Sequence, residues 1–307
     1  MSQSSLAINQ MPFVLFVGKS MSEIKRPVTL VACGILMKED GGFLMGSRPE
    51  GKPYAGYWEF PGGKLEFGES VHQALAREMR EELGLTVKDS APWVTLEHDY
   101  PHAYVRLHFV RSWDWSGIPR CLEGQSAGFF DKDHLPDLVL PTDEPIRRFM
   151  HLPLHWLRLN ATTGDWEARL RVAATRQAEA LMVEGECLAD YEAIKATAMQ
   201  LGIKEVWVHV MANESVQQAA DGVFVHSADE LPMVKNERLA VPALPDHWSD
   251  FEKAGALWAY STGVQVGSSA WQKLFLANPM PIYLSGVVLD DEKPLRRHGA
   301  QGWIELI

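Results

Sequence analysis

The sequence has few cysteines and no apolar run long enough to span a bilayer. Its three cysteines, Cys33, Cys121 and Cys187, are too few and too scattered for a disulfide framework or a zinc site. This predicts a reducing compartment, the cytoplasm. The apolar run at 11–17 is too short for a membrane span, and it lacks the basic flank and the small-residue cleavage site of a signal peptide. We therefore expect no membrane partner.

Basic residues are also in deficit. The chain has 29 Lys and Arg against 40 Asp and Glu, which gives a net charge of -11. Binding to a nucleic-acid polymer requires patches of Lys and Arg that face its phosphates, so we expect no such polymer as a partner. The hydrophobic content of 46% and the charged content of 22% are ordinary for a globular protein. A length of 307 residues predicts two domains.

The pattern of strands and helices changes near residues 152–153. Before this point the apolar and β-branched runs predict strands at 28–37, 43–48, 93–98 and 104–113, and a short helix at 143–151. After it, helical patterns alternate with eight short strand-like runs, at 154–159, 180–184, 205–210, 221–226, 238–243, 257–261, 281–285 and 302–307. This alternation predicts an α/β fold with a parallel sheet built by crossovers.

Eight strand-like runs allow a closed (β/α)₈ barrel, although the segment is short for a fold of usually ~250 residues. We divide the chain into a flexible extension at 1–26, a first domain at 27–151 and a second domain, the small barrel, at 152–307. Met21 is an alternative start of translation within the extension. The sequence leaves the oligomeric state open.

Residues 61–85, PGGKLEFGESVHQALAREMREELGL, contain a helix with three glutamates on one side. A capping box formed by Ser70 and Gln73 starts the helix, and Gly84 ends it. The apolar positions 71, 74 and 75 define one face at 100° per residue. The acidic positions 78, 81 and 82 continue that face, although like charges at such spacing destabilise a helix.

Two interpretations of these acids are open. A solvated acidic face stabilised by a pair such as Arg77 with Glu81 is the plainer one. Because the acids fall where the apolar pattern points inward, we favour convergence on a hard divalent cation. Mg²⁺ prefers oxygen ligands of this kind, and a cation removes the repulsion among the carboxylates.

The stretch from Gly63 to Leu85 resembles the complete Nudix box. The matching fixed positions are Gly63, Glu69, Arg77, Glu78, Glu81, Glu82 and Gly84. Seven such residues, each at roughly 5–7% usage, coincide by chance on the order of once in 10⁹ positions. The likeness runs from about Val28 to His151. It implies an α/β/α sandwich around a mixed sheet and Mg²⁺-dependent hydrolysis of a nucleoside diphosphate linked to another moiety, with Mn²⁺ as the alternative metal.

The resemblance also implies roles for single residues. Arg77 is implied to orient Glu78, and Glu69 to support the loop before the helix. A metal-bound water of lowered pKa would attack the diphosphate. The general base stays open between Glu78, the first choice, and Glu123. The implied metal ligands are the carbonyl of Gly62 and the carboxylates of Glu78, Glu81, Glu82 and Glu123.

Within this family the chain is most similar to the MutT 8-oxo-dGTP diphosphatases. It shares Arg48, EFPGGK at 59–64, EGQ at 123–125 and PTDEP at 141–145. The likeness implies that Phe60 packs on the purine and that Arg48 and Lys64 contact the substrate. Ordinary core packing of Phe60 and surface positions for the two cations are the alternatives.

Asp143 stands where the MutT pattern has an asparagine. An amide donates and accepts hydrogen bonds, whereas an ionised carboxylate only accepts them. Either burial keeps Asp143 protonated, or it accepts hydrogen bonds from the guanine edge alone. Asp143 is therefore a candidate substrate-binding residue, and this difference leaves both the oxidised and the ordinary guanine base open as the preferred one.

The second half resembles, more weakly, thiamine phosphate synthase and its TenI relatives. The matches are ADGV at 220–223, PIY at 281–283 and HGAQG at 298–302. A phosphate-binding loop needs glycines and backbone N–H donors, but 285–287 reads SGV. The polar and basic motifs expected at 242–244 and 184–186 are PAL and EGE. We expect a catalytically degenerate barrel.

These observations favour an enzyme that hydrolyses 8-oxo-dGTP to the monophosphate and pyrophosphate and so removes oxidised nucleotides before they enter DNA. Its partner is a nucleotide substrate. One alternative is a Nudix hydrolase of another nucleoside diphosphate derivative. Another is a ligand-sensing protein that uses the barrel. A bifunctional thiamine enzyme is disfavoured by the altered loops.

Overall fold

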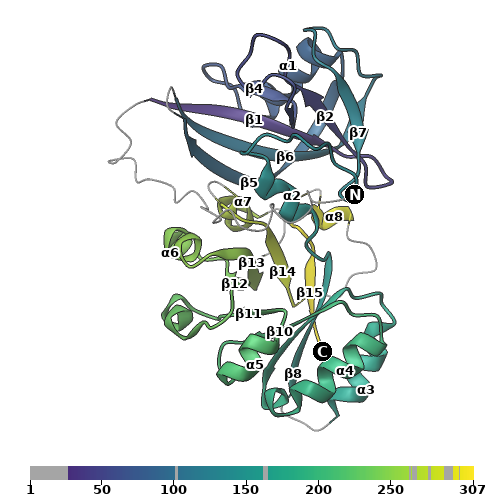
Figure 1. Ribbon diagram of the computed structural model, residues 1–307, viewed down its shortest axis with the longest axis vertical. Helices are drawn as coiled ribbons and strands as arrows, with labels where there is room; N and C mark the ends of the chain where they lie inside the picture. Colours follow the sequence, from purple (N-terminus) through teal and green to yellow (C-terminus); the bar gives the residue numbers. More distant parts are fainter. Residues whose placement is uncertain are drawn as a thin grey trace, which may run out of the picture.

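The computed structural model describes residues 27–100, 103–161, 165–262, 264, 268–275, 278–286, 293–296 and 298–307. Figure 1 shows two parts stacked along the longest axis: an N-terminal region of sheets, residues 27–150, and a barrel formed by the described residues after 150. The extension expected at 1–26, with Met21, lies outside the described residues. No helix in the described part of the chain has the length and apolarity that crossing a membrane requires.

The N-terminal region contains two sheets. The first is four-stranded and mixed, in the order β4-β1-β6-β5, with β1 and β6 parallel. The second is antiparallel, in the order β3-β2-β7. Their strands are β1 (Val28–Leu36), β2 (Phe43–Ser47), β3 (Trp58–Glu59), β4 (Gly62–Lys64), β5 (Thr86–Asp99), β6 (Tyr104–Ser116) and β7 (Ala127–Phe130). The mixed sheet confirms the sequence-based expectation, whereas the short strands β3, β4 and β7 were not predicted.

Helix α1 (Val71–Leu83) lies against the mixed sheet and carries most of the acidic motif. The expected capping box between Ser70 and Gln73 is present, and Gly84 ends the helix in the left-handed conformation with φ 66°. The apolar side of the helix buries Ala74, Leu75, Met79 and Leu83. Local sequence signals therefore located both ends of this helix. The second helix of the region is α2 (Glu144–Met150).

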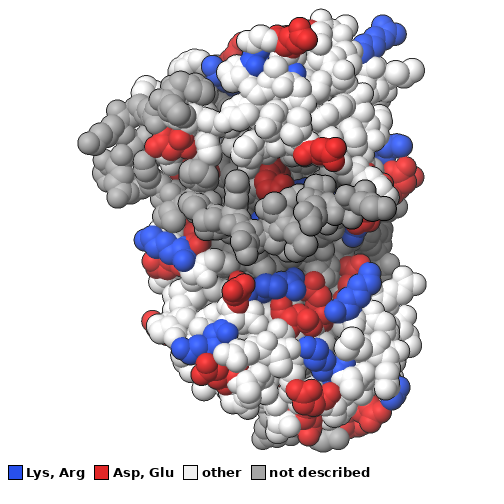
Figure 2. Space-filling view, viewed as in Figure 1, with Lys and Arg blue, Asp and Glu red and all other residues white. Residues whose placement is uncertain are grey.

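The barrel is closed, and its eight strands are all parallel, in the order β10-β11-β12-β13-β14-β15-β8-β9. The strands are β8 (His155–Ala161), β9 (Ala180–Gly185), β10 (Glu205–His209), β11 (Gly222–Phe224), β12 (Leu239–Pro242), β13 (Ala256–Thr262), β14 (Ile282–Ser285) and β15 (Trp303–Leu306). All eight coincide with the strand-like runs of the sequence, which confirms the small (β/α)₈ architecture. The described helices of the barrel are α3 (Trp166–Ala174), α4 (Tyr191–Gln200), α5 (Glu214–Ala219), α6 (Trp248–Lys253), α7 (Ser269–Leu274) and α8 (Lys293–Arg296). On the face shown in Figure 2, acidic and basic side chains lie intermixed over the barrel.

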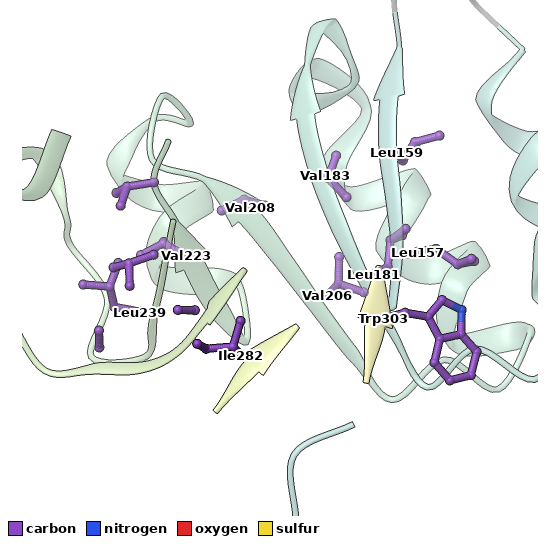
Figure 3. Packing of buried hydrophobic residues seen from close by; sticks show 14 of the residues in the cluster. Leu157, Leu159, Leu181, Val183, Val206, Val208, Val223, Leu239, Ile282 and Trp303 are labelled. Atoms are coloured by element: carbon purple, nitrogen blue, oxygen red, sulfur yellow. The ribbon is translucent and has the colours of Figure 1, made fainter. Parts of the chain in front are cut away.

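Alternate strand residues face opposite sides of the barrel wall. Aliphatic side chains such as Leu157, Val183 and Val206 pack in one cluster (Figure 3). Aromatic rings fill the opposite, interior side, where Trp156 of β8 lies 4.7 Å from Trp258 of β13, measured between ring centroids. These two strands are not neighbours, so their rings meet across the interior.

The N-terminal ends of the barrel strands lie against β5 and β6. Asn278, fully buried, donates through Nδ2 to the carbonyl of Trp93 at 2.6 Å, and its backbone carbonyl accepts from the N–H of Thr95 at 2.8 Å. The Trp93 indole donates to Gln301 at 3.1 Å. One buried hydrophobic cluster includes residues of both parts. The division at 151–152 stays a proposal, with α2 ending at Met150 and β8 beginning at His155.

Candidate active site

Arg77 joins the loop before α1 to the acidic side of the helix. Its Nε and Nη2 donate to the two oxygens of Glu69, both at 2.9 Å, and its Nη1 donates to Glu78 at 2.8 Å. Nη2 also donates to the carbonyl of Lys64 at 2.9 Å. The hydrogen bonds from Arg77 lower the pKa of Glu69 to about 2. The carboxylate of Glu78 is thus held in one orientation by a cation that is itself fixed by Glu69.

Two glycines permit the close approach of β4 to its neighbours. A Cβ on Gly63 would lie 2.1 Å from Oε1 of Glu78. A Cβ on Gly62 would lie 1.9 Å from the carbonyl oxygen of Ala32 in β1. Any side chain at either position would displace the carboxylate or the strand. The glycine pair of the motif is therefore required by packing around the site.

A hollow of about 40 Å³ lies beside the C-terminal half of α1 and is lined by Gly62, Glu82, Glu123 and residues that were not predicted, among them Glu59 and Lys52. Burial, followed by the charges of Glu78, Glu123 and Glu59, raises the pKa of Glu82 to about 7. Burial also raises the pKa of Glu59. These carboxylates are close enough to repel one another, as the sequence-based interpretation of a converging acidic group requires.

Glu123 reaches this hollow because its loop is bonded to the last turn of α1. The side chain of Gln125 donates to the carbonyl of Glu82 at 2.9 Å and accepts from the N–H of Glu123 at 2.9 Å. The N–H of Leu122 donates to the same Glu82 carbonyl at 3.0 Å. Lys52 Nζ lies 3.7 Å from the Glu123 carboxylate. The EGQ motif therefore combines a carboxylate with the amide that positions its loop.

The residues present fit a divalent cation. Among the described residues, no three His, Cys, Asp or Glu side chains are already grouped in a form that could hold a metal ion. The donors around the hollow are carboxylate oxygens and the backbone of Gly62. Hard cations prefer oxygen ligands of this kind. A bound cation would also offset the repulsion from the neighbouring acids, which together with burial raises the pKa of Glu82. Glu81 is placed differently: its side chain is 57% exposed, and it lies 3.5 Å from Arg77.

The expected substrate-binding residues are divided between surface and core. Arg48 donates to Glu59 at 2.6 Å and to the carbonyl of Pro53 at 2.7 Å. Phe60 is only 5% exposed and packs against the rings of Phe43 and Phe109. Lys64 is exposed. The structure thus places Arg48 near the hollow and the Phe60 ring in the hydrophobic core.

Asp143 is buried directly behind the Phe60 backbone. Its side chain is 4% exposed, and its Oδ2 accepts a hydrogen bond from the Phe60 N–H at 2.9 Å. Burial raises the pKa of Asp143 to about 8, against the lowering effect of that hydrogen bond. Asp143 is therefore mostly protonated at neutral pH. A neutral carboxylic acid both donates and accepts, so it keeps the hydrogen-bonding capacity of an amide.

Sequence reasoning did not assign roles to Glu59 and Lys52. Glu59 stands in the EFPGGK motif, but nothing in the sequence indicates a role for this residue. Its burial and its ion pair with Arg48 depend on the fold. Lys52 lies in a loop without any sequence signal. Both line the hollow, so both are candidates for contact with a charged substrate.

The C-terminal ends of the barrel strands carry a separate polar cluster. Arg158 donates to both oxygens of Glu184, at 2.8 and 2.9 Å. The His226 ring lies 2.8 Å from Glu184 and 2.8 Å from the hydroxyl of Tyr260. These groups are bonded to one another. The loss of synthase activity that the altered loops predict stays a prediction.

The first part of the chain is similar to known proteins. A model of the NUDIX domain matches residues 27–165. The 8-oxo-dGTP diphosphatase of Haemophilus influenzae is 35% identical over 112 residues, which is 36% of this chain and 82% of that protein. The 8-oxo-dGTP diphosphatase of Escherichia coli is 33% identical over 117 residues, 38% of this chain and 91% of that protein. The CTP pyrophosphohydrolase of Escherichia coli is 35% identical over 112 residues, 36% of this chain and 83% of that protein.

The chain therefore belongs to the Nudix family and is a pyrophosphohydrolase. Hydrolases of this family generally depend on a divalent metal ion. The roles of the single site residues stay predictions.

Proposed function

We propose that the protein is a Mg²⁺-dependent nucleoside triphosphate pyrophosphohydrolase that converts 8-oxo-dGTP to the monophosphate and pyrophosphate. The observation that carries the proposal is the group of mutually repelling carboxylates around the hollow beside α1. The similarity to two 8-oxo-dGTP diphosphatases supports the choice of base. A cytoplasmic location, proposed from the cysteine content, agrees with this role.

Different residues of the site would bind the metal, orient a carboxylate, bind phosphate and accept a proton. Gly62, Glu78, Glu82 and Glu123 would hold the cation, which, when bound, neutralises phosphate charge and lowers the pKa of a water. Arg77 holds the carboxylate of Glu78 through a hydrogen bond of 2.8 Å. Lys52, at the edge of the hollow, would bind a phosphate group. Either Glu78 or Glu123 would accept the proton of the attacking water.

Asp143 is proposed to read the purine edge as a neutral acid. Its burial and raised pKa supply the donor that the asparagine of the MutT pattern would supply. A pyrophosphohydrolase that prefers another nucleotide is the alternative, because a CTP pyrophosphohydrolase is equally similar in sequence identity.

A substrate panel tests the proposal. Initial rates would be measured with Mg²⁺ for 8-oxo-dGTP, dGTP, CTP and ADP-ribose, with Mn²⁺ and excess chelator as metal controls. We expect the highest kcat/KM for 8-oxo-dGTP and no turnover in chelator. Preparations of the Glu78→Gln variant control for contaminating phosphatases. A higher kcat/KM for CTP or ADP-ribose would reject the proposed substrate, and full activity in chelator would reject the metal.

A further inference from the structure

A cavity of about 260 Å³ lies between the N-terminal end of the barrel and the sheets. Trp93 and Arg111 line it from the mixed sheet, and Leu154, Glu179 and Gln301, each just before a barrel strand, line it from the barrel. Its described lining residues are all different from those of the hollow beside α1. The cavity is therefore a second site, formed only where the two parts of the chain meet.

Arg111 is a buried cation without an anionic partner among the described residues. It is 3% exposed, and the acceptors of its guanidinium in the described part of the chain are all neutral: the carbonyls of Gly299 and Ala300, at 3.1 and 2.5 Å, and the side chain of Gln301 at 3.4 Å. Its Nε is buried and makes no hydrogen bond. The cation lies over the rings of Trp93 and Trp113, at 4.8 and 5.4 Å from their centroids.

Burial of the Arg111 cation without a counter-ion among the described residues is unfavourable in free energy. Removing an ion from water without a counter-ion costs several kcal/mol, and arginine does not escape this cost by losing its proton under ordinary conditions. The stacked rings and carbonyl dipoles offset part of the cost, but the described residues around Arg111 do not include the carboxylate that pairs with most buried arginines. An oxyanion supplied from outside would complete it.

The remaining charges of the lining favour an anion. Lys132 and Lys204, both exposed, add two cations to that of Arg111. The acids among the described lining residues, Glu179 and Glu205, already have hydrogen-bond or ion-pair partners. Glu179 accepts a hydrogen bond from the N–H of Leu154 at 2.6 Å, and Glu205 pairs with Arg238 at 3.0 Å. In a chain of net charge -11, this is a locally positive cavity.

We propose that this cavity binds a small metabolite that carries a phosphate or carboxylate group, with its oxyanion against Arg111. A guanidinium pairs with both groups through parallel N–H donors. The side chains of Met37, Phe43 and Met150, which also line the cavity, would pack on the apolar part of the metabolite. A bound molecule contacts both parts of the chain, so it stabilises their packing. The inference does not depend on which nucleotide the active site hydrolyses.

Calorimetric titration of the intact protein tests the proposal. Inorganic phosphate and succinate would be titrated separately in excess chelator, which removes metal-dependent binding at the active site, with ionic strength held constant by sodium chloride. We expect saturable binding of at least one anion and a rise in Tm that chloride does not produce. The anion that binds more tightly identifies the group as phosphate or carboxylate. Absence of saturable binding for both overturns the proposal.

Variants locate the binding. Replacement of both Lys132 and Lys204 by alanine is expected to raise Kd about three- to tenfold, as loss of two partly screened charges does. The matched control, alanine at the exposed Lys235 and Lys253, removes the same charge outside the cavity lining and leaves Kd unchanged. Equal Kd values in both double variants would place the anion elsewhere and overturn the proposal. Arg111→Gln, where circular dichroism shows that it folds, is expected to lose about 10- to 100-fold in affinity.

Discussion

Asp143 and Phe60, far apart in the sequence, are joined by one buried hydrogen bond, from the backbone N–H of Phe60 to Oδ2 of Asp143 at 2.9 Å. The bond holds the loop that follows β3 against the start of α2. Because the carboxyl group is buried, its pKa rises to about 8. Stability at this position therefore depends on pH, and so would the recognition of the base that we propose for Asp143.

The first prediction concerns stability. The folded-state pKa of Asp143 is above its ordinary value of 3.8, so the native state binds the proton more tightly and the free energy of unfolding falls as pH rises from about 4 to 8. Asp143→Asn removes this loss. At pH 7 the variant should be more stable than the wild type by up to about 4 kcal/mol, because about three pH units separate pH 7 from the ordinary pKa, and the difference should vanish near pH 4.

Urea unfolding of both proteins between pH 4.5 and 8.5, in chelator, measures this difference. Asp246→Asn serves as the control, because Asp246 is an exposed aspartate on the barrel, and it should leave the pH dependence unchanged. Parallel stability curves for the wild type and Asp143→Asn would show that Asp143 keeps an ordinary pKa.

The second prediction concerns recognition of the base. Asp143→Asn keeps a donor and an acceptor and should retain the selectivity for 8-oxo-dGTP over dGTP. Asp143→Ala leaves the purine edge unpaired and should cost about 1–3 kcal/mol in kcat/KM. The wild type should lose kcat/KM as pH rises through about 8, whereas the Asn variant should not. If the Ala variant matches the wild type for both nucleotides, Asp143 lies outside the base pocket.

The third prediction concerns catalysis. Glu78→Gln removes a charge held by Arg77 at 2.8 Å and should lower kcat by at least ~10², the scale expected for loss of a general base. Glu39→Gln, at an exposed position in the turn after β1, is the matched control and should keep full activity. Near-normal turnover of a folded Glu78→Gln enzyme would exclude Glu78 as the base and leave Glu123 as the candidate.

The fourth prediction concerns the metal. Burial and neighbouring acids raise the pKa of Glu82 from 4.5 to about 7, so the metal-free protein should lose stability as pH rises from about 4.5 to 7. Above pH 7 the ionised carboxylate is available to a cation. Mg²⁺ at 10 to 100 times its Kd should then add about 1.4–2.7 kcal/mol to the free energy of unfolding.

Unfolding with Mg²⁺ or chelator at pH 5.5 and pH 8 measures the effect, which should be larger at pH 8. Glu82→Gln should weaken it, whereas Glu39→Gln should not. An effect of Mg²⁺ that is independent of pH and of Glu82 would remove this residue from the set of ligands.

Several features of the protein are determined by the sequence itself because they depend on residues close together in the chain. The capping box at Ser70, the left-handed end at Gly84 and the spacing of the acids on α1 are of this kind. The eight barrel strands were also predictable, since buried parallel strands appear as short apolar runs separated by helical patterns. Strands β3 and β7, with two and four residues, are too short to show the alternation of apolar and polar residues that identifies a strand in a sequence.

Only the tertiary structure decided the ionisation and pairing of the buried groups. The raised pKa of Asp143 comes from burial behind Phe60 and the charge of Glu59, and Arg111 meets Gln301 across the contact between sheet and barrel. A pKa depends on the solvent and charges around a group, and those neighbours come from distant parts of the chain. The sequence determines which ionisable groups are present. The fold determines which of them are buried from solvent and which form a hydrogen bond or an ion pair.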